Sequence, residues 1–128
     1  MTHDLTPAAA WKQMRDGNRR FVNEEPRHPN QDVARRKGLA EAQNPVATLF
    51  GCSDSRLAAE IIFDLGLGDL FVVRNAGQVI GESIVASLEY AVAVLNVPLI
   101  VVLAHDSCGA VRAAIDGTAI DAAPVPPH

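Results

Sequence analysis

Three short apolar runs constrain the fold more than any other feature of this sequence. They span residues 46–51, 70–73 and 98–104, and none of them alternates apolar with polar side chains. Strands buried on both faces of a parallel sheet have this unbroken apolar pattern, whereas strands with one solvated face alternate. Segments with helical spacing separate the runs. This order predicts an α/β fold with an open, mostly parallel β-sheet flanked by helices.

The helical segments lie before, between and after the predicted strands. Residues 7–23 have Thr6 in the N-cap position and Pro7 in the first turn, both typical of a helix start. The predicted apolar stripe of this helix comprises Ala10, Trp11, Met14 and Phe21. Further helices are predicted over residues 32–42, 58–65, 81–95 and 109–115. The apolar face of residues 81–95 comprises Ile84, Leu88, Ala91 and Leu95.

These elements divide the chain into three parts. Residues 1–45 are predicted to form an N-terminal helical arm, and residues 46–116 an α/β core that carries the candidate site. Residues 117–128 end in Ala-Pro-Val-Pro-Pro-His and are expected to be a flexible tail. A chain of 128 residues can bury one modest core.

Charge and hydropathy argue against several classes of partner. The formal net charge is −4, whereas nucleic acids and anionic membranes attract basic surfaces. No apolar run approaches the roughly 20 residues of a membrane helix. The first residues also lack the basic and then apolar pattern of a signal peptide. We therefore expect a cytoplasmic protein without nucleic-acid or membrane partners.

Two cysteines and one histidine follow strand ends. Cys52 comes directly after the first apolar run, His105 follows the third, and Cys108 comes three residues later at a predicted helix start. Ligands of open α/β sheets bind outside the carboxyl ends of the strands. If these two strands are neighbours, the three side chains converge at one edge. Thiolate and imidazole ligands suit zinc, and three protein ligands leave a fourth tetrahedral position open, as in catalytic sites.

Simpler interpretations exist for each of these residues. Free cysteines are most often small buried apolar side chains, and a histidine after a strand is often a hydrogen-bonded loop residue. A disulfide is not expected in a cytoplasmic protein. The run Cys-Ser-Asp-Ser-Arg makes coincidence less plausible, because Asp54 and Arg56 can pair beside Cys52. Such a pair is usually a solvated ion pair worth less than about 1 kcal/mol, but beside a metal the carboxylate is a ligand or a hydrogen-bond acceptor.

Two motifs give the chain a specific resemblance. Cys-Ser-Asp-Ser-Arg at residues 52–56 and His-Asp-Ser-Cys-Gly at residues 105–109 look like the two signature motifs of the β-class carbonic anhydrases. Phe-Val-Val-Arg-Asn-Ala-Gly at residues 71–77 and Glu-Tyr-Ala-Val at residues 89–92 also match, in order and at fitting separations. The resemblance extends from the helix of residues 7–23 to Gly109, and it is similar in detail to actinobacterial members.

The resemblance implies roles for the residues of the two motifs. Cys52, His105 and Cys108 would hold one zinc ion per chain. Asp54 and Arg56 would form the catalytic pair that orients the nucleophile at the metal. In the closed form of some members the matching aspartate is the fourth zinc ligand, a role that the resemblance extends to Asp54.

Four further residues match substrate-binding positions of the family. Gln43 matches a glutamine that hydrogen-bonds substrate, and Phe71 and Tyr90 match aromatic residues of the pocket, some of them contributed by a partner subunit. Gly109 closes the second motif. The alternatives are an exposed loop amide for Gln43 and core packing for Phe71 and Tyr90. Arg74 could attract an anion or form a surface salt bridge.

The implied activity is the zinc-dependent, reversible hydration of carbon dioxide to bicarbonate and a proton. The alternatives are a related zinc hydrolase of carbon disulfide or carbonyl sulfide, and a non-catalytic zinc-binding fragment of the same fold. The family extends its sheet across a subunit interface, so we expect a homodimer or a dimer of dimers. Typical members continue well beyond the second motif, so the core is expected to be incomplete relative to the family.

Overall fold

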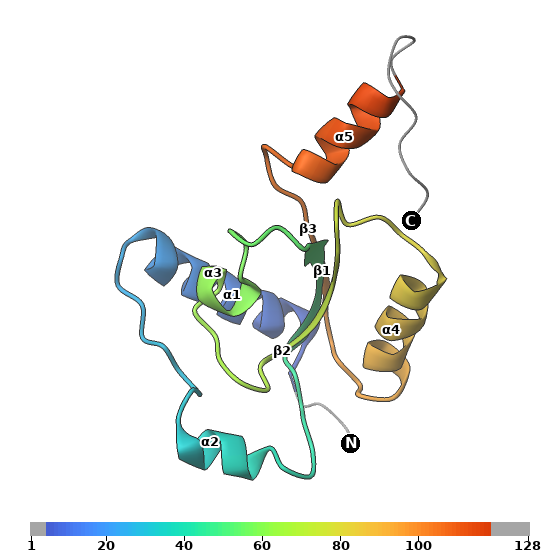
Figure 1. Cartoon of the computed structure of the whole chain (residues 1–128). Helices are drawn as coiled ribbons and strands as arrows, with labels where there is room; N and C mark the ends of the chain where they lie inside the picture. The colour runs from blue at the N-terminus through green and yellow to red at the C-terminus, as the bar shows by residue number, and fades with distance from the viewer. Residues whose placement is uncertain (1–4, 119–128) are drawn as a thin grey trace.

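The computed structural model describes residues 5–118 and confirms the predicted α/β fold. Three parallel strands form one sheet in the order β2-β1-β3 (Figure 1). They span Ala47–Cys52 (β1), Leu70–Asn75 (β2) and Ile100–Leu103 (β3). Cys52 lies opposite Asn75, and Gly51 lies opposite Leu103. The carboxyl ends of all three strands therefore meet at one edge of the sheet.

The sheet separates two apolar clusters. Helices α1 (Pro7–Val22) and α3 (Ala59–Ile62) lie on one side of it, and α4 (Glu82–Ala93) lies on the other (Figure 1). Leu49 packs in the cluster that contains Met14, Ala59 and Phe63, whereas its neighbour Phe50 packs with Val73 and Ile84. Because successive strand residues point to opposite faces, burial on both faces explains the unbroken apolar run of β1.

Two predicted helices are shorter than expected. The helix predicted over residues 32–42 is α2 (Val33–Gly38), and it buries none of its residues. A helix without a buried apolar face lacks the packing that stabilises most protein helices, so its propensity alone does not extend it. The helix predicted over residues 58–65 is the four-residue α3. It ends because Asp64 adopts a positive φ of 45°, which turns its carboxylate toward the backbone amides of residues 27 and 28.

The apolar stripe predicted for α1 is only partly confirmed. Thr6 caps the helix as expected, accepting a hydrogen bond from the Ala9 amide. Ala10 and Met14 are buried, but Trp11 and Phe21 are each 41% exposed. Gly17 takes the third buried position, because any Cβ there would overlap the carbonyl oxygen of Phe63. The helix thus contacts α3 through a small residue and leaves its large aromatic side chains on the surface.

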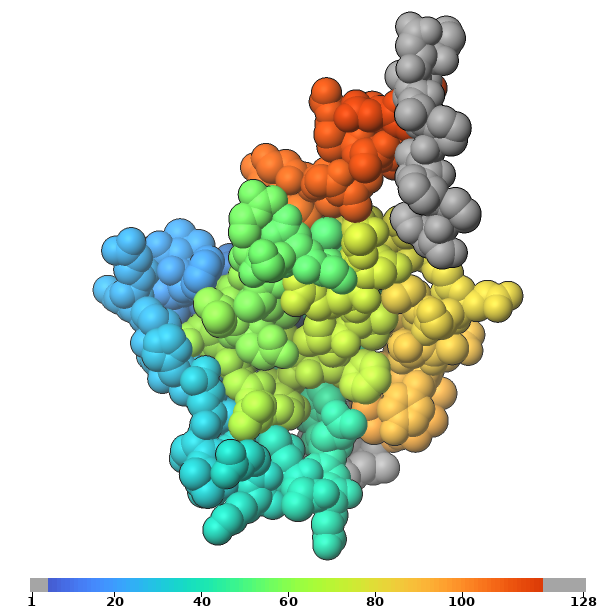
Figure 2. All heavy atoms as spheres, in the orientation of Figure 1, coloured from blue at the N-terminus to red at the C-terminus, as the bar shows by residue number. Residues whose placement is uncertain are grey.

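The last described helix, α5 (Gly109–Gly117), projects from the carboxyl end of the sheet (Figures 1 and 2). It buries none of its residues, and Val111 and Ile115 are exposed. Ile100 and Val102 of the edge strand β3 are exposed as well. No helix among residues 5–118 is long and apolar enough to cross a bilayer. Most of the predicted tail, residues 119–128, lies outside the described residues.

Candidate metal centre

The predicted convergence of Cys52, His105 and Cys108 is confirmed. Their candidate ligand atoms all lie within 4.8 Å of one another. Cys52 is the last residue of β1, and the other two residues follow β3, which pairs directly with β1. Cys108 is the N-cap residue of α5. Both cysteines are free thiols, with their sulfur atoms 3.8 Å apart.

The hydrogen bonding of His105 leaves one ring nitrogen available as a ligand. Nδ1 lies 2.7 Å from the carbonyl oxygen of Asp106, to which it can only donate. The other nitrogen, Nε2, is buried and has no hydrogen-bond partner among the described residues. An unsatisfied buried nitrogen costs free energy, whereas a histidine ligand typically donates its other N–H to a carbonyl or carboxylate. The imidazole is thus arranged as a metal ligand, and two thiolates with one imidazole are a donor set that zinc prefers.

The thiol of Cys52 is stabilised as a thiolate. The backbone amide of Gly77 donates to its Sγ at 3.3 Å. This hydrogen bond, with a further contribution from the adjacent His105, lowers the pKa of Cys52 to about 6. Gly77 has a φ of 83°, a conformation accessible to glycine, in the turn that presents its N–H to the sulfur. Since the thiolate is the form that binds metal, this hydrogen bond favours a metal ligand at neutral pH.

Asp54 and Arg56 form a bidentate ion pair beside the cluster. The guanidinium donates from Nε to Oδ1 at 2.9 Å and from Nη2 to Oδ2 at 2.6 Å. The Arg56 amide also donates to Oδ1. These bonds hold the pKa of Asp54 well below its usual range and raise that of Arg56. Arg56 further donates to the carbonyl oxygen of Ser107, which links the pair to the loop between His105 and Cys108.

Two contacts of the site were not foreseen from the sequence. Within residues 5–118, Arg74 forms hydrogen bonds to the carbonyl oxygens of Cys52 and Asp54 rather than a surface salt bridge. The Gly77 amide contacts the Cys52 sulfur. The sequence did place both residues near the site, because residues 74–77 form the end of β2, the strand beside β1, and the turn that follows it. The direction of a guanidinium and the path of a turn depend on tertiary contacts that strand order does not specify.

A cavity of about 460 Å³ lies beside the cluster. Its lining comprises His105, Ser107, Cys108, Gly109, Val111, Arg112 and Ile115. Gly109 is the first residue of α5, and a Cβ there would meet no atom within 4 Å. Four of the lining residues belong to the motif of residues 105–109, and Val111 and Ile115 are apolar residues of α5. The predicted substrate position Gly109 therefore opens onto space next to the metal ligands.

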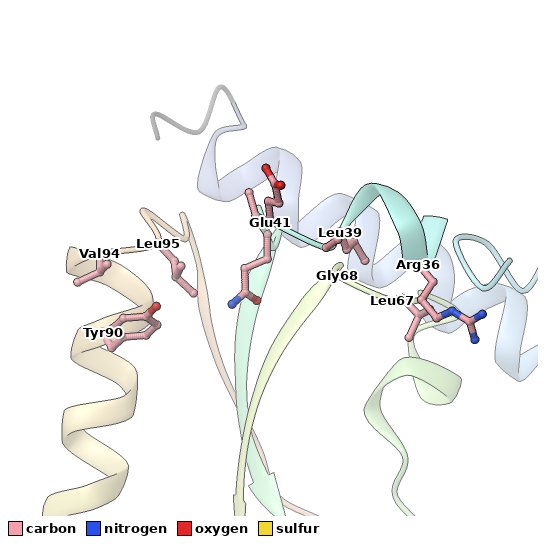
Figure 3. Close-up of a pocket in the computed structure, with 11 residues that line it drawn as sticks. Arg36, Leu39, Glu41, Leu67, Gly68, Tyr90, Val94 and Leu95 are labelled. Carbon is pink, nitrogen blue, oxygen red and sulfur yellow. The ribbon is translucent and has the colours of Figure 1, made fainter. Parts of the chain in front are cut away.

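Gln43 and Tyr90 are not brought to this cluster within the chain. Both line a different cavity, of about 640 Å³, whose walls precede the amino ends of the strands (Figure 3). A strand of six residues is roughly 20 Å long, and the metal ligands lie at its other end. Phe71 belongs to the second residue pair of the β1–β2 ladder, and its ring lies 5.9 Å from that of Tyr90. Phe71 also packs against the cluster that contains Phe50.

Comparison with known proteins links this geometry to one family. A family model described as carbonic anhydrase matches residues 47–125. The chain is 64% identical over 119 residues to carbonic anhydrase 2 of Mycobacterium tuberculosis strain H37Rv. This match covers 90% of this chain and 58% of that protein. It is 60% identical over 120 residues to a carbonic anhydrase of Mycolicibacterium smegmatis, in a match that covers 94% of this chain and 57% of that protein.

Solved structures share the fold. One is from a study titled as two tetrameric β-carbonic anhydrases of Sordaria macrospora, with a TM-score of 0.61 and 31% identity. The match covers 88% of this chain and 54% of that one. The chain thus spans somewhat more than half the length of the relatives it matches.

Proposed function

This chain belongs to the β-class carbonic anhydrase family, and we propose that it catalyses the reversible hydration of carbon dioxide to bicarbonate and a proton. The observation that carries the proposal is the cluster of Cys52, His105 and Cys108, in which the buried Nε2 of His105 has no other partner among the described residues. Such a three-ligand set leaves one position of a tetrahedral metal open for chemistry.

Cys52, His105 and Cys108 would hold one zinc ion per chain. When bound, zinc lowers the pKa of a coordinated water to about 7, an effect for which carbonic anhydrase is the standard example. The protein supplies two thiolates and one neutral imidazole. The Gly77 amide keeps the Cys52 sulfur ionised, and the Asp106 carbonyl fixes the tautomer of His105.

Asp54 is proposed to orient the attacking water. Its low pKa keeps it ionised at any neutral pH, so its oxygens can accept a hydrogen bond but cannot donate one. Arg56 fixes both oxygens and connects them to the Ser107 carbonyl. Carbon dioxide has little polarity, and the side chains of Val111 and Ile115 offer an apolar wall in the adjoining cavity. The substrate itself needs little binding energy, so the role proposed for this wall is to place its carbon near the attacking water.

We also propose that the protein is a homodimer or a dimer of dimers. Gln43 and Tyr90 line a cavity remote from the metal ligands of their own chain, so they would serve as substrate-binding residues in the site of a second copy. The exposed rings of Trp11 and Phe21 support burial of α1 in such an assembly. The solved relatives of Sordaria macrospora are described as tetrameric. A cytoplasmic location is proposed because a reducing compartment keeps two nearby cysteines as free thiols.

Stopped-flow measurement of carbon dioxide hydration with a pH indicator tests the activity. The zinc-loaded protein should accelerate hydration, whereas the metal-free protein and Cys52→Ser should not. Ser87→Ala is a suitable control, since Ser87 contacts the backbone of α4 away from the site. Carbonyl sulfide and carbon disulfide should be assayed in parallel. Hydrolysis of either without hydration of carbon dioxide would favour the sulfur substrates, and zinc binding without any turnover would favour a non-catalytic fragment.

A further inference from the structure

The Arg74 side chain donates hydrogen bonds to two backbone carbonyl oxygens that flank Ser53. Its Nε donates to the carbonyl oxygen of Cys52 and its Nη2 to that of Asp54, each at 2.8 Å. Arg74 lies opposite Gly51 in the β1–β2 register, one residue before β2 ends. A guanidinium is a rigid, planar group whose donors have fixed directions. It therefore fixes the two carbonyl oxygens relative to each other as well as to β2.

The segment held in this way joins two chemically distinct groups. Cys52 contributes a sulfur to the metal cluster, whereas Asp54 contributes the carboxylate paired with Arg56. Ser53 lies between them, and its amide donates to the Asn75 carbonyl at 2.8 Å. The whole turn after β1 is thus fastened to the end of β2. The side chain and the backbone of Asp54 are held by two different arginines.

The Asp54 carboxylate, which lies beside the candidate metal ligands, has two competing partners. Its oxygens can remain on Arg56, as they do in this structure, or they can bind zinc, for which aspartate is a common ligand. Arg56 also contacts the carbonyl of Ser107, which adjoins Cys108, so the pair lies next to the metal ligands. A movement of the carboxylate onto the metal that shifts the backbone of residues 53–54 would strain the hydrogen bonds that Arg74 donates to the Cys52 and Asp54 carbonyl oxygens. The two hydrogen bonds from Arg74 oppose that shift.

We propose that Arg74 is a positioning residue that fixes the carbonyl oxygens of Cys52 and Asp54 and thereby keeps the Asp54 carboxylate on Arg56 and off the metal. The inference rests on the proposed function, because it assigns Arg74 to the same zinc site. Lysine cannot replace arginine here, since one ammonium group does not span two carbonyl oxygens in a fixed fork. Charge alone therefore does not explain the residue at this position.

Substitution of Arg74 in zinc-loaded and cobalt-loaded protein tests the proposal. Cobalt(II) in the zinc site gives a visible absorption spectrum that reports its ligands. Arg74→Lys should retain one metal per chain but change the cobalt spectrum, and hydration should slow by about 10-fold, the scale of residues that orient metal ligands. The double variant Arg74→Lys with Asp54→Asn should return toward the spectrum of Asp54→Asn alone, because the competing carboxylate is gone. Arg19→Lys, an exposed change on α1, is the matched control.

The result that overturns the proposal is an Arg74→Lys protein with the parent's cobalt spectrum and the parent's hydration rate. A spectral change that persists in the double variant would also overturn it, since Asp54 would not be the incoming ligand. If thermal melting shows that Arg74→Lys is not folded, Arg74→Gln provides the same comparison with a shorter amide donor. The spectrum is read without turnover, so an inactive parent would contradict the proposed function while the test of Arg74 proceeds unchanged.

Discussion

The sulfur atoms of Cys52 and Cys108 lie 3.8 Å apart, although 56 residues separate the two cysteines in the chain. Two thiolates bound to one tetrahedral zinc at about 2.3 Å each would have sulfur atoms about 3.8 Å apart. The separation is well beyond the roughly 2 Å of a disulfide. The site therefore has the spacing of a metal-bound pair of thiolates in a chain whose cysteines are both free.

Removal of either sulfur should release the metal. We expect close to one zinc per folded chain, and Cys52→Ser or Cys108→Ser should lose most of it because a hydroxyl is a poor zinc ligand. Metal analysis of the purified proteins by mass spectrometry checks this, with Ser87→Ala as the control that keeps its zinc. Full zinc content in both cysteine variants would disprove the ligand assignment.

Zinc should protect the two thiols from oxidation. In metal-free protein, hydrogen peroxide is expected to oxidise both thiols to one intramolecular disulfide, with two molecules of water formed from the peroxide. The sulfur atoms are close enough for this after a small movement of α5, which buries none of its residues. Intact-mass measurement should show a loss of two hydrogens in the metal-free protein and none in the zinc-loaded protein. Equal oxidation of both forms would contradict the prediction.

Asp54 should serve turnover rather than metal retention. Asp54→Asn keeps the shape of the side chain but removes the charge that Arg56 holds in place. We expect zinc to remain and hydration to slow by about 10²-fold or more, the scale of an orienting or acid–base group. Asp16→Asn, on the exposed face of α1, should leave the rate unchanged. Unaltered hydration by Asp54→Asn across pH 7 to 9 would exclude this role.

The contacts of Asp64 with residues 20–28 should make the stability of the protein depend on pH in the acid range. Burial by itself would raise its pKa, but hydrogen bonds from the Arg27 amide, the Arg20 guanidinium and the His28 amide outweigh burial and lower the pKa from 3.8 to about 2. A depressed pKa in the folded state stabilises the fold above the unfolded value. This contribution should therefore be lost as the pH falls from about 4 to about 2.

Asp64→Asn should remove that pH dependence. At pH 7 it should lower the free energy of unfolding by on the order of 3 kcal/mol, because it leaves the partly buried Arg20 without its charge partner. Urea unfolding of metal-free protein measures this without interference from zinc release in acid. Asp16→Asn should cost less than about 1 kcal/mol, since its ion pair with Lys12 is exposed. A parent and an Asp64→Asn protein with parallel stability curves between pH 4 and pH 2 would refute the assignment.

The proposed assembly should dissociate on dilution, with a loss of activity. If Gln43 and Tyr90 complete the site of a second copy, specific activity should fall as the protein is diluted below the dissociation constant of the assembly. Light scattering at the same concentrations should show the matching fall in mass. Gln43→Ala should lower activity without altering zinc content. A stable monomer with full specific activity would be incompatible with a shared site.

The sequence by itself determined the sheet and the convergence of the three candidate metal ligands. Unbroken apolar runs require burial on both faces, which a parallel sheet between helices provides. Once strands are parallel, their carboxyl ends meet at one edge, so Cys52 at the end of one run and His105 after another converge wherever those strands pair. The pairing of β1 with β3 then brings Cys108 into the same cluster. These conclusions depend on local patterns and on one general property of parallel sheets.

Tertiary structure decided what depends on contacts between distant segments. The early end of α3 follows from the three donors that Asp64 receives from residues 20–28, and nothing local marks them. The same is true of Arg74, whose two carbonyl acceptors belong to the last residue of β1 and to a residue of the turn that follows it. Tyr90 reads as a pocket residue in sequence, but its position in the last turn of α4 places it at the far end of the sheet from Cys52. Side-chain direction and the ends of short helices are set by long-range packing and hydrogen bonding, which periodicity along the chain does not encode.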